Sequence, residues 1–168
     1  MLFTSSMTAP GADNPDHCDD PCSLQFGALC WRMHRGQVEV LLITSRDTGR
    51  WVIPKGWAIE GLSPALSAAR EAWEEAGVEG EVSDIGLGQF RYDKVVRPSQ
   101  FIPCEVQVFG LRVARLAERF PERKQRRRKW FNAETAARKV NEPQLRELLA
   151  ALPQGLDQLA TGKTLVQD

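Results

Sequence analysis

The sequence has no long run of apolar residues and no excess of charge of either sign. Without an apolar stretch of about 18 residues, we expect neither a signal peptide nor a membrane-spanning helix. The 22 basic and 22 acidic side chains give a formal net charge of zero. Total charge therefore favours neither a membrane nor a nucleic acid as partner.

Residues that bind zinc are also scarce, with two histidines and four cysteines in the chain. His17, Cys18 and Cys22 lie close together, but His34 is the only other histidine and no fourth ligand has an accepted spacing. We therefore expect no zinc site. We expect free thiols in a reducing compartment and a cytoplasmic location.

Composition divides the chain into one domain and two tails. Its 168 residues, of which 42% are hydrophobic, suit one domain with a sizeable core. Residues 1–22 are rich in Ser, Pro, Gly, Asp and Asn without a sustained period, which predicts a disordered tail. We expect the domain over residues 23–152 and a frayed end over residues 153–168, because Pro153 and Gly155 are expected to end the last helix.

A short helix is predicted between Ser63 and Gly77. Ser63 suits the N-cap, Pro64 suits the first helical position, and Gly77 can take the left-handed conformation that ends many helices. An apolar stripe at helical spacing is formed by Leu66, Ala69, Trp73 and Ala76.

Three glutamates lie on this helix at positions i, i+3 and i+4, namely Glu71, Glu74 and Glu75. Their Cβ atoms are expected roughly 5–6 Å apart, so their charges repel each other. A divalent cation such as Mg²⁺, which prefers oxygen ligands, would relieve this repulsion. The alternative is a solvated acidic face.

The stretch around this helix resembles the Nudix box, Gly-x5-Glu-x7-Arg-Glu-U-x-Glu-Glu-x-Gly-U, where U is apolar. The positions in register are Gly56, Arg70, Glu71, Ala72, Glu74, Glu75, Gly77 and Val78. Leu62 departs from the pattern, because the family has its first glutamate there. That glutamate commonly supports the box arginine, so Glu60 either pairs with Arg70 instead or is simply exposed. On these residues the chain is identified as a member of the Nudix hydrolase superfamily.

The resemblance implies an α+β fold, in which a mixed β-sheet lies between helices as a Nudix-type α/β/α sandwich. The sequence pattern predicts strands over residues 24–34, 38–44, 51–53, 81–92 and 102–114, and helices over residues 133–140 and from Pro143. The run EVLLI suits an interior strand. Residues 91–99 are polar and are expected to form a loop on the substrate side.

The resemblance also implies metal-dependent chemistry. Glu71, Glu75 and Glu74, with the Gly56 carbonyl, are expected to hold Mg²⁺ or Mn²⁺. In-line attack by a metal-bound water would break a pyrophosphate bond in a nucleoside diphosphate derivative or related polyphosphate. Glu75 or Glu74 is expected to accept the proton, and Arg70 belongs to the catalytic set.

The runs GRWVIPKGW and RKWF are similar to the branch of diadenosine polyphosphate and diphosphoinositol polyphosphate phosphohydrolases. The substrate is therefore expected to be a small phosphorylated molecule. Candidate phosphate-binding residues are Lys55, Arg46, Arg50 and Tyr92. The alternative to an enzyme is a Nudix-like module that binds a nucleotide with little catalysis.

Two further features have open interpretations. Glu105 is a candidate for an additional metal ligand or base, or it is an outward-facing strand glutamate. Residues 122–129, ERKQRRRK, either border the acidic site as a basic lip or form a solvated loop. RNA binding by this run is the third alternative and is not expected. The sequence does not predict the oligomeric state.

Overall fold

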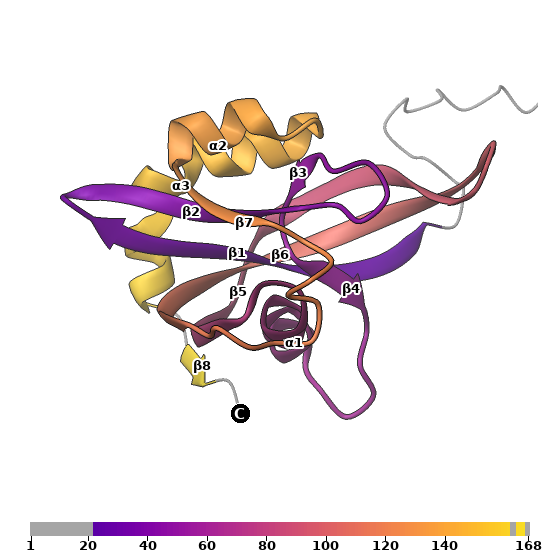
Figure 1. Ribbon diagram of the computed structural model, residues 1–168. Helices are drawn as coiled ribbons and strands as arrows, with labels where there is room; N and C mark the ends of the chain where they lie inside the picture. The colour runs from indigo at the N-terminus through magenta and orange to yellow at the C-terminus, as the bar shows by residue number, and fades with distance from the viewer. Residues whose placement is uncertain (1–21, 162–163, 167–168) are drawn as a thin grey trace, which may run out of the picture.

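The computed structural model describes residues 22–161 and 164–166 (Figure 1). Residues 1–21 of the tail expected over residues 1–22, with His17 and Cys18, lie outside the described residues. The sheet strands are β1 (Ser23–His34), β2 (Gln37–Thr44), β3 (Trp51–Val52), β4 (Lys55–Trp57), β5 (Val78–Arg97), β6 (Gln100–Leu116), β7 (Arg128–Asn132) and β8 (Thr164–Val166). The helices are α1 (Pro64–Ala76), α2 (Ala133–Lys139) and α3 (Pro143–Thr161).

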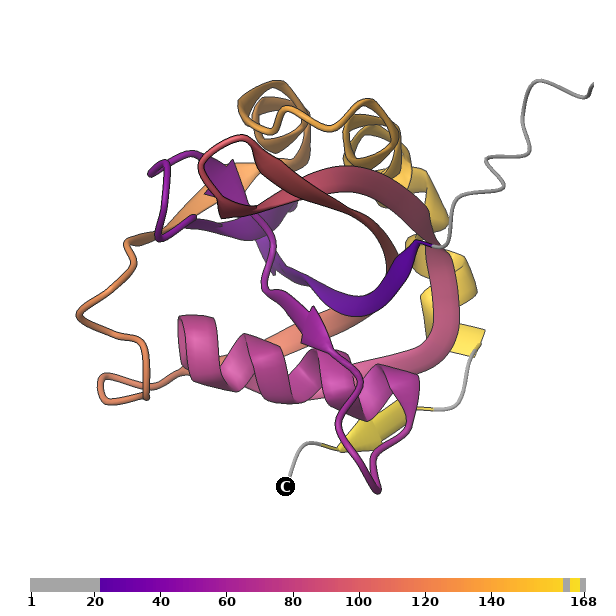
Figure 2. The same ribbon diagram turned by 90° about the vertical axis from the view of Figure 1, so that its right-hand side faces the viewer.

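The strands form one mixed sheet in the order β3-β2-β1-β6-β5-β8, with β4 paired to β1 and β7 paired to β2. The pair β1 and β6 is parallel, whereas the other pairs are antiparallel. Helix α1 covers one face of the sheet, and α2 and α3 cover the other (Figure 2). The predicted α+β sandwich with a mixed sheet is confirmed.

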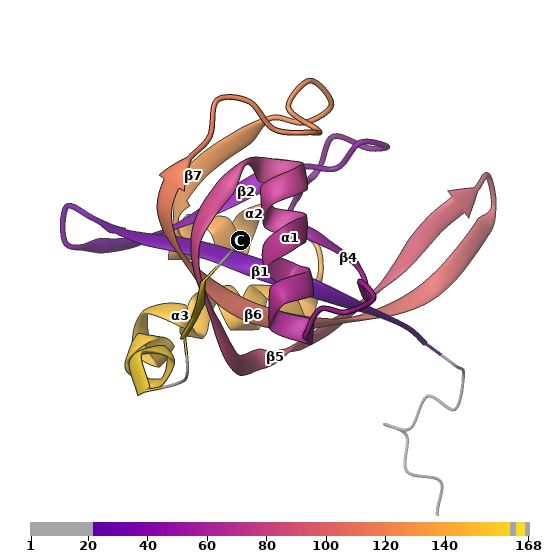
Figure 3. The same ribbon diagram turned by 90° about the horizontal axis from the view of Figure 1, so that it is seen from below.

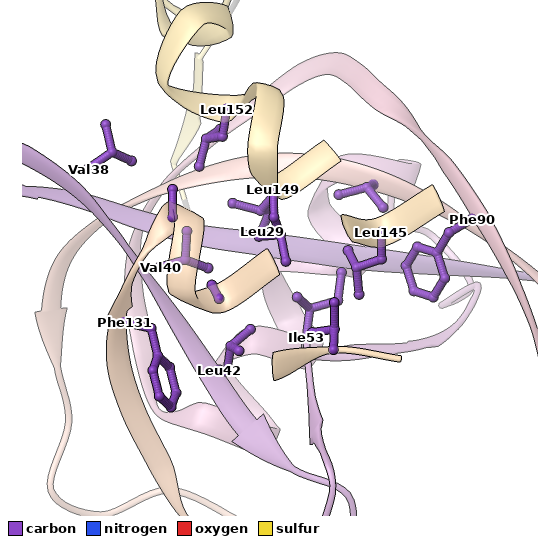
Figure 4. Packing of buried hydrophobic residues seen from close by; sticks show 14 of the residues in the cluster. Leu29, Val38, Val40, Leu42, Ile53, Phe90, Phe131, Leu145, Leu149 and Leu152 are labelled. Carbon is purple, nitrogen blue, oxygen red and sulfur yellow. The ribbon is translucent and has the colours of Figure 1, made fainter. Parts of the chain in front are cut away.

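The core has one layer on each face of the sheet. On the side of α2 and α3, Leu145 and Leu149 of α3 pack with Leu29 and Val40 of the sheet (Figure 4). On the side of α1, a row of alanines packs against β1, where α1 lies across the strand (Figure 3). Strand β2 pairs with β1, β3 and β7, so the predicted interior strand is confirmed.

The loop predicted over residues 91–99 is wrong. Strand β5 continues to Arg97, β6 begins at Gln100, and Arg97 pairs with Gln100 across a two-residue turn. Ser99 takes a φ of 64°, the left-handed conformation that tight hairpin turns need. The two strands form a long arm that extends away from the body of the domain (Figures 1 and 3).

The predicted end of the last helix at Pro153 is also wrong, because α3 continues to Thr161. Leu145, Leu149, Leu152 and Leu156 follow one face of the helix and pack on the core, whereas Pro153 lies on the exposed side. Packing of that face outweighs the helix-breaking tendency of proline. In the described part of the chain, no helix is long and apolar enough to cross a membrane.

Candidate active site

Helix α1 begins and ends as its sequence predicts. The Ser63 hydroxyl accepts a hydrogen bond from the backbone N–H of Leu66 at 3.2 Å, and Pro64 follows as the first helical residue. Gly77 ends the helix at a φ of 65°, where its N–H donates to the carbonyls of Ala72 and Trp73. These two ends fix which residues of α1 face the sheet.

The core face of α1 consists of small side chains, with Ala65, Ala68, Ala72 and Ala76 fully buried. Leu66 and Trp73 of the predicted stripe are only partly buried. Because alanine lets α1 approach β1 closely, the next face of the helix reaches the backbone of β4. That face carries Glu71 and Glu75.

Glu75 is held from two sides. Its Oε2 accepts a hydrogen bond from the backbone N–H of Lys55 at 3.3 Å, and its Oε1 lies 3.3 Å from Nη2 of Arg126. Glu71 lies against Gly56, where an added Cβ would collide with the Glu71 carboxylate. The glycine of the box is therefore required for the close approach of β4 and α1.

Burial raises the pKa of Glu75 to about 7, against the opposing charges of Arg126 and Lys55. Burial also raises the pKa of Glu71 to about 7, and the neighbouring charges of Glu75, Glu74 and Glu122 add to this effect. Two acidic groups that are costly to ionise side by side would be stabilised by a bound cation.

The acidic pair fits a hard divalent cation. Mg²⁺ is commonly held by one or two carboxylates and completes its shell with waters and substrate phosphate. Among the described residues, no three His, Cys, Asp or Glu side chains are already arranged to hold a metal. Glu71 and Glu75, beside the Gly56 backbone, are therefore the residues that would hold it, and a ligand role for Glu74 stays a prediction.

Sequence reasoning missed Glu122 and Arg126. Nη2 of Arg126 lies 3.3 Å from a carboxylate oxygen of both Glu75 and Glu122, and its Nη1 donates to the Thr44 carbonyl at 3.2 Å. The backbone N–H of Glu122 donates to the Glu74 carbonyl at 2.9 Å, which ties this loop to α1. The only signal in the sequence was the basic run, whose individual side chains look alike.

The basic run is therefore not a plain solvated loop. The side chain of Arg126 is 9% exposed, and Nη1 of Arg128 donates to the Ala76 carbonyl at 2.7 Å. Lys129 continues into β7, which pairs with β2. Part of this run borders the acidic pair, as the lip interpretation expected.

Lys55 and Tyr92 lie together on the other side of Glu75. The Lys55 ammonium is 4.8 Å from the centre of the Tyr92 ring, and the Tyr92 hydroxyl donates to Gln25 at 2.6 Å. Burial lowers the pKa of Lys55, whereas the charges of Glu75 and Glu142 oppose that shift. Lys55 thus lies beside the acidic pair, and phosphate binding by Lys55 or Tyr92 stays a prediction.

Both predicted phosphate-binding arginines have acidic partners. Nη1 of Arg50 lies 2.5 Å from Oε1 of Glu142, and the Glu142 side chain is 6% exposed. Nη1 of Arg46 lies 3.3 Å from Glu122, and its side chain is 57% exposed. Phosphate binding by either arginine stays a prediction.

Arg70 lies away from the acidic pair. It is exposed, and with Leu62 and Trp73 it lines a cavity of about 670 Å³ on a different face of α1. No ion pair joins Arg70 to Glu60 within residues 22–161, and Glu60 is exposed. A catalytic role for Arg70 has no contact in this structure to support it and stays a prediction.

Glu105 pairs with Arg91 at 3.7 Å on the β5–β6 arm. No interaction in the described part of the chain joins Glu105 to the box glutamates. This placement favours the interpretation as a strand glutamate over a role as ligand or base.

Residues 23–152 match the NUDIX domain. The match covers most of the chain, so the chain belongs to the Nudix family, and the superfamily predicted from the box is confirmed.

Curated relatives share part of their length with this chain. Nudix hydrolase 12, mitochondrial, of Arabidopsis thaliana is 33% identical over 103 residues, which are 60% of this chain and 51% of the relative. Diphosphoinositol polyphosphate phosphohydrolase 3-alpha of Homo sapiens is 32% identical over 110 residues, 64% of this chain and 63% of the relative. The chain spans about half to two thirds of these relatives. The human phosphohydrolase supports the predicted branch. Because the Arabidopsis relative is named as mitochondrial, a cytoplasmic location stays a prediction.

Solved structures share the fold. The Ap4A hydrolase of C. elegans has a TM-score of 0.61 at 19% identity, over 81% of this chain and 99% of that chain. The NUDIX domain of Shewanella oneidensis NrtR, cocrystallised with ADP ribose, has a TM-score of 0.61 at 16% identity, over 87% of this chain and 94% of that chain. At these identities the likeness shows the fold alone.

Proposed function

We propose that this protein hydrolyses a pyrophosphate bond in a nucleoside diphosphate derivative or a related polyphosphate, with Mg²⁺ or Mn²⁺ as cofactor. The observation that carries this proposal is the half-buried carboxylate of Glu71 and the buried carboxylate of Glu75, which lie together beside Lys55. The names of relatives make diadenosine polyphosphates and diphosphoinositol polyphosphates the first compounds to test.

Each residue around the pair has a physical role in this reaction. A bound divalent ion would neutralise phosphate charge and lower the pKa of a water molecule. Glu75 is the candidate to accept the proton, and the Lys55 N–H and Arg126 keep its carboxylate oriented. The Lys55 ammonium, placed over Tyr92, is suited to meet phosphate charge. Glu74 is the alternative base.

Hydrolysis of a panel of pyrophosphates in Mg²⁺, followed by product analysis, tests the proposal. We expect release of phosphorylated products from at least one compound, and loss of the reaction in excess EDTA. Turnover that persists in EDTA would contradict the proposed chemistry.

A binding module is the second candidate, and Leu62 is the observation that favours it, because this box position lines a cavity of mixed polarity away from the acidic pair. The NrtR domain cocrystallised with ADP ribose is a Nudix-fold protein that binds a nucleotide. Calorimetry with diadenosine tetraphosphate in Mg²⁺ separates the candidates, since heat of binding without any product would favour the module.

A further inference from the structure

The connection between α2 and α3 ends in a buried acidic residue, Glu142. Glu142 is 6% exposed, although a charged side chain in such a place is costly unless it is paired. One carboxylate oxygen contacts Nη1 of Arg50 at 2.5 Å. The other oxygen is buried and has no hydrogen-bond partner among the described residues. Glu142 is therefore largely desolvated, and Arg50 compensates only one of its two oxygens.

The surroundings hold Glu142 in this place. Gln144 accepts a hydrogen bond from the backbone N–H of Arg91 at 2.8 Å, which ties the start of α3 to β5 next to Tyr92. Nε of Arg146 donates to the Val140 carbonyl at 2.7 Å, and the Arg146 N–H donates to the Glu142 carbonyl at 3.0 Å. These bonds fix the backbone around Glu142, and Arg50 holds its side chain.

The Arg50–Glu142 pair belongs to the charges around Lys55. The charges of Glu75, Glu142, Arg50 and Arg126 all act on the Lys55 ammonium. The Arg50 side chain is 30% exposed, whereas Glu142 lies beneath it. The Arg50 guanidinium is thus partly open to solvent, and its charge is already compensated from behind by Glu142.

We propose that Glu142 is a specificity-determining residue that acts through Arg50. By neutralising Arg50, it makes the site select a pyrophosphate whose remaining part is an uncharged sugar and base. It disfavours one whose remaining part is a densely phosphorylated inositol ring. This inference rests on the proposed function, since it assigns a substrate class to the same site.

Glu142 would select against a highly phosphorylated substrate because the additional phosphates would find no uncompensated positive charge beside Arg50. Additional phosphates entering beside Arg50 would lose their hydration and would meet the Glu142 carboxylate behind the guanidinium. A nucleoside would place no charge there. Replacing Glu142 by a neutral residue would free Arg50 for a charge-assisted hydrogen bond to phosphate.

The test compares kcat/KM for a diphosphoinositol pentakisphosphate with kcat/KM for diadenosine tetraphosphate in the same Mg²⁺ buffer. In Glu142→Gln we expect the ratio to rise about tenfold, the effect of one charge-assisted hydrogen bond. Glu134→Gln is the matched control, because it removes the same charge from an exposed ion pair with Arg138 on α2. The control should leave the ratio unchanged.

A double variant, Arg50→Gln with Glu142→Gln, shows whether the effect passes through Arg50. We expect the ratio to return toward the wild-type value, and an equal rise in the double variant would overturn the proposal. Because Glu142 is buried, folding is checked by thermal melting, and Glu142→Ser serves as a second neutral variant with room for water.

If the wild type hydrolyses diadenosine tetraphosphate, but the ratio of the two kcat/KM values is the same in Glu142→Gln and Glu142→Ser as in the wild type, the role of Glu142 alone is refuted. Absence of all pyrophosphate hydrolysis would refute the proposed function instead. In that case the ratio of the two dissociation constants, measured by calorimetry, still tests Glu142. No change of that ratio in Glu142→Gln would refute its role.

Discussion

The raised pKa values of Glu71 and Glu75 make the stability of the protein depend on pH in a defined direction. Each pKa rises from 4.5 to about 7 on folding. Between these values the folded state binds more protons than the unfolded state, so the free energy of unfolding falls as pH rises. The free energy of unfolding is unaffected by these groups below about pH 4.5, falls between pH 4.5 and about pH 7, and does not fall further above that pH.

The size of this loss follows from the shift. For Glu75, a pKa rise of this size lowers the free energy of unfolding by about 3 kcal/mol once the group is ionised. Glu71 is half-buried and better screened by solvent, and its shift depends in part on Glu75, so the two costs do not add in full. We expect a total loss of about 3 kcal/mol between pH 5 and pH 8 in protein kept free of metal.

Urea unfolding in EDTA, followed by tryptophan fluorescence at a series of pH values, measures this loss. Glu75→Gln should abolish most of the dependence, because that variant has no carboxylate to ionise at position 75. Excess Mg²⁺ should restore stability above pH 7, by about 2.7 kcal/mol at one hundred times its dissociation constant. A free energy of unfolding in EDTA that is constant or rises over this pH range would refute the reasoning.

Three other variants test the site. Glu75→Gln should fold and lose at least about 10²-fold in hydrolysis, and near-normal turnover would remove Glu75 as the base. Gly56→Ala should weaken Mn²⁺ affinity, measured by calorimetry, by about tenfold or more because its Cβ displaces Glu71; Gly86→Ala, where a Cβ has room, is its control. Arg126→Met should cost about 3 kcal/mol in urea unfolding, because it removes the buried cation that the buried Glu75 and the partly buried Glu122 share; a cost under about 0.5 kcal/mol would contradict the role of Arg126.

Local signals in the sequence predicted α1 and its ends well. Ser63, Pro64 and Gly77 act through backbone groups within one turn of the helix, so their effect can be deduced without knowing the tertiary structure. The placement of Glu71 and Glu75 on one face followed from helical spacing in the same way.

Longer-range features were not predictable from local pattern. Pro153 predicted a helix end, but the packing of Leu156 on a core formed by distant strands continues α3 past it. The polar stretch before Ser99 predicted a loop, but pairing of β5 with β6 satisfies its backbone instead.

The ion-pair partners of charged residues likewise could not be predicted from the sequence. Arg50 meets Glu142 across 92 positions of sequence, and Arg126 meets Glu75 across the domain. A sequence shows that these charges exist, but only the fold shows which ones are neutralised. For that reason the sequence did not show the acidic partner of Arg50, and Glu122 and Arg126 were missed.

The central claim is that Glu71 and Glu75, beside Gly56, hold a divalent cation. Anomalous diffraction from crystals soaked in Mn²⁺ tests it most directly, with Glu75→Gln crystals as the comparison. The account predicts a manganese peak within coordination distance of both carboxylates in the wild type, and a weaker peak in the variant. Manganese bound elsewhere, with Glu71 and Glu75 far from any peak, would contradict the account.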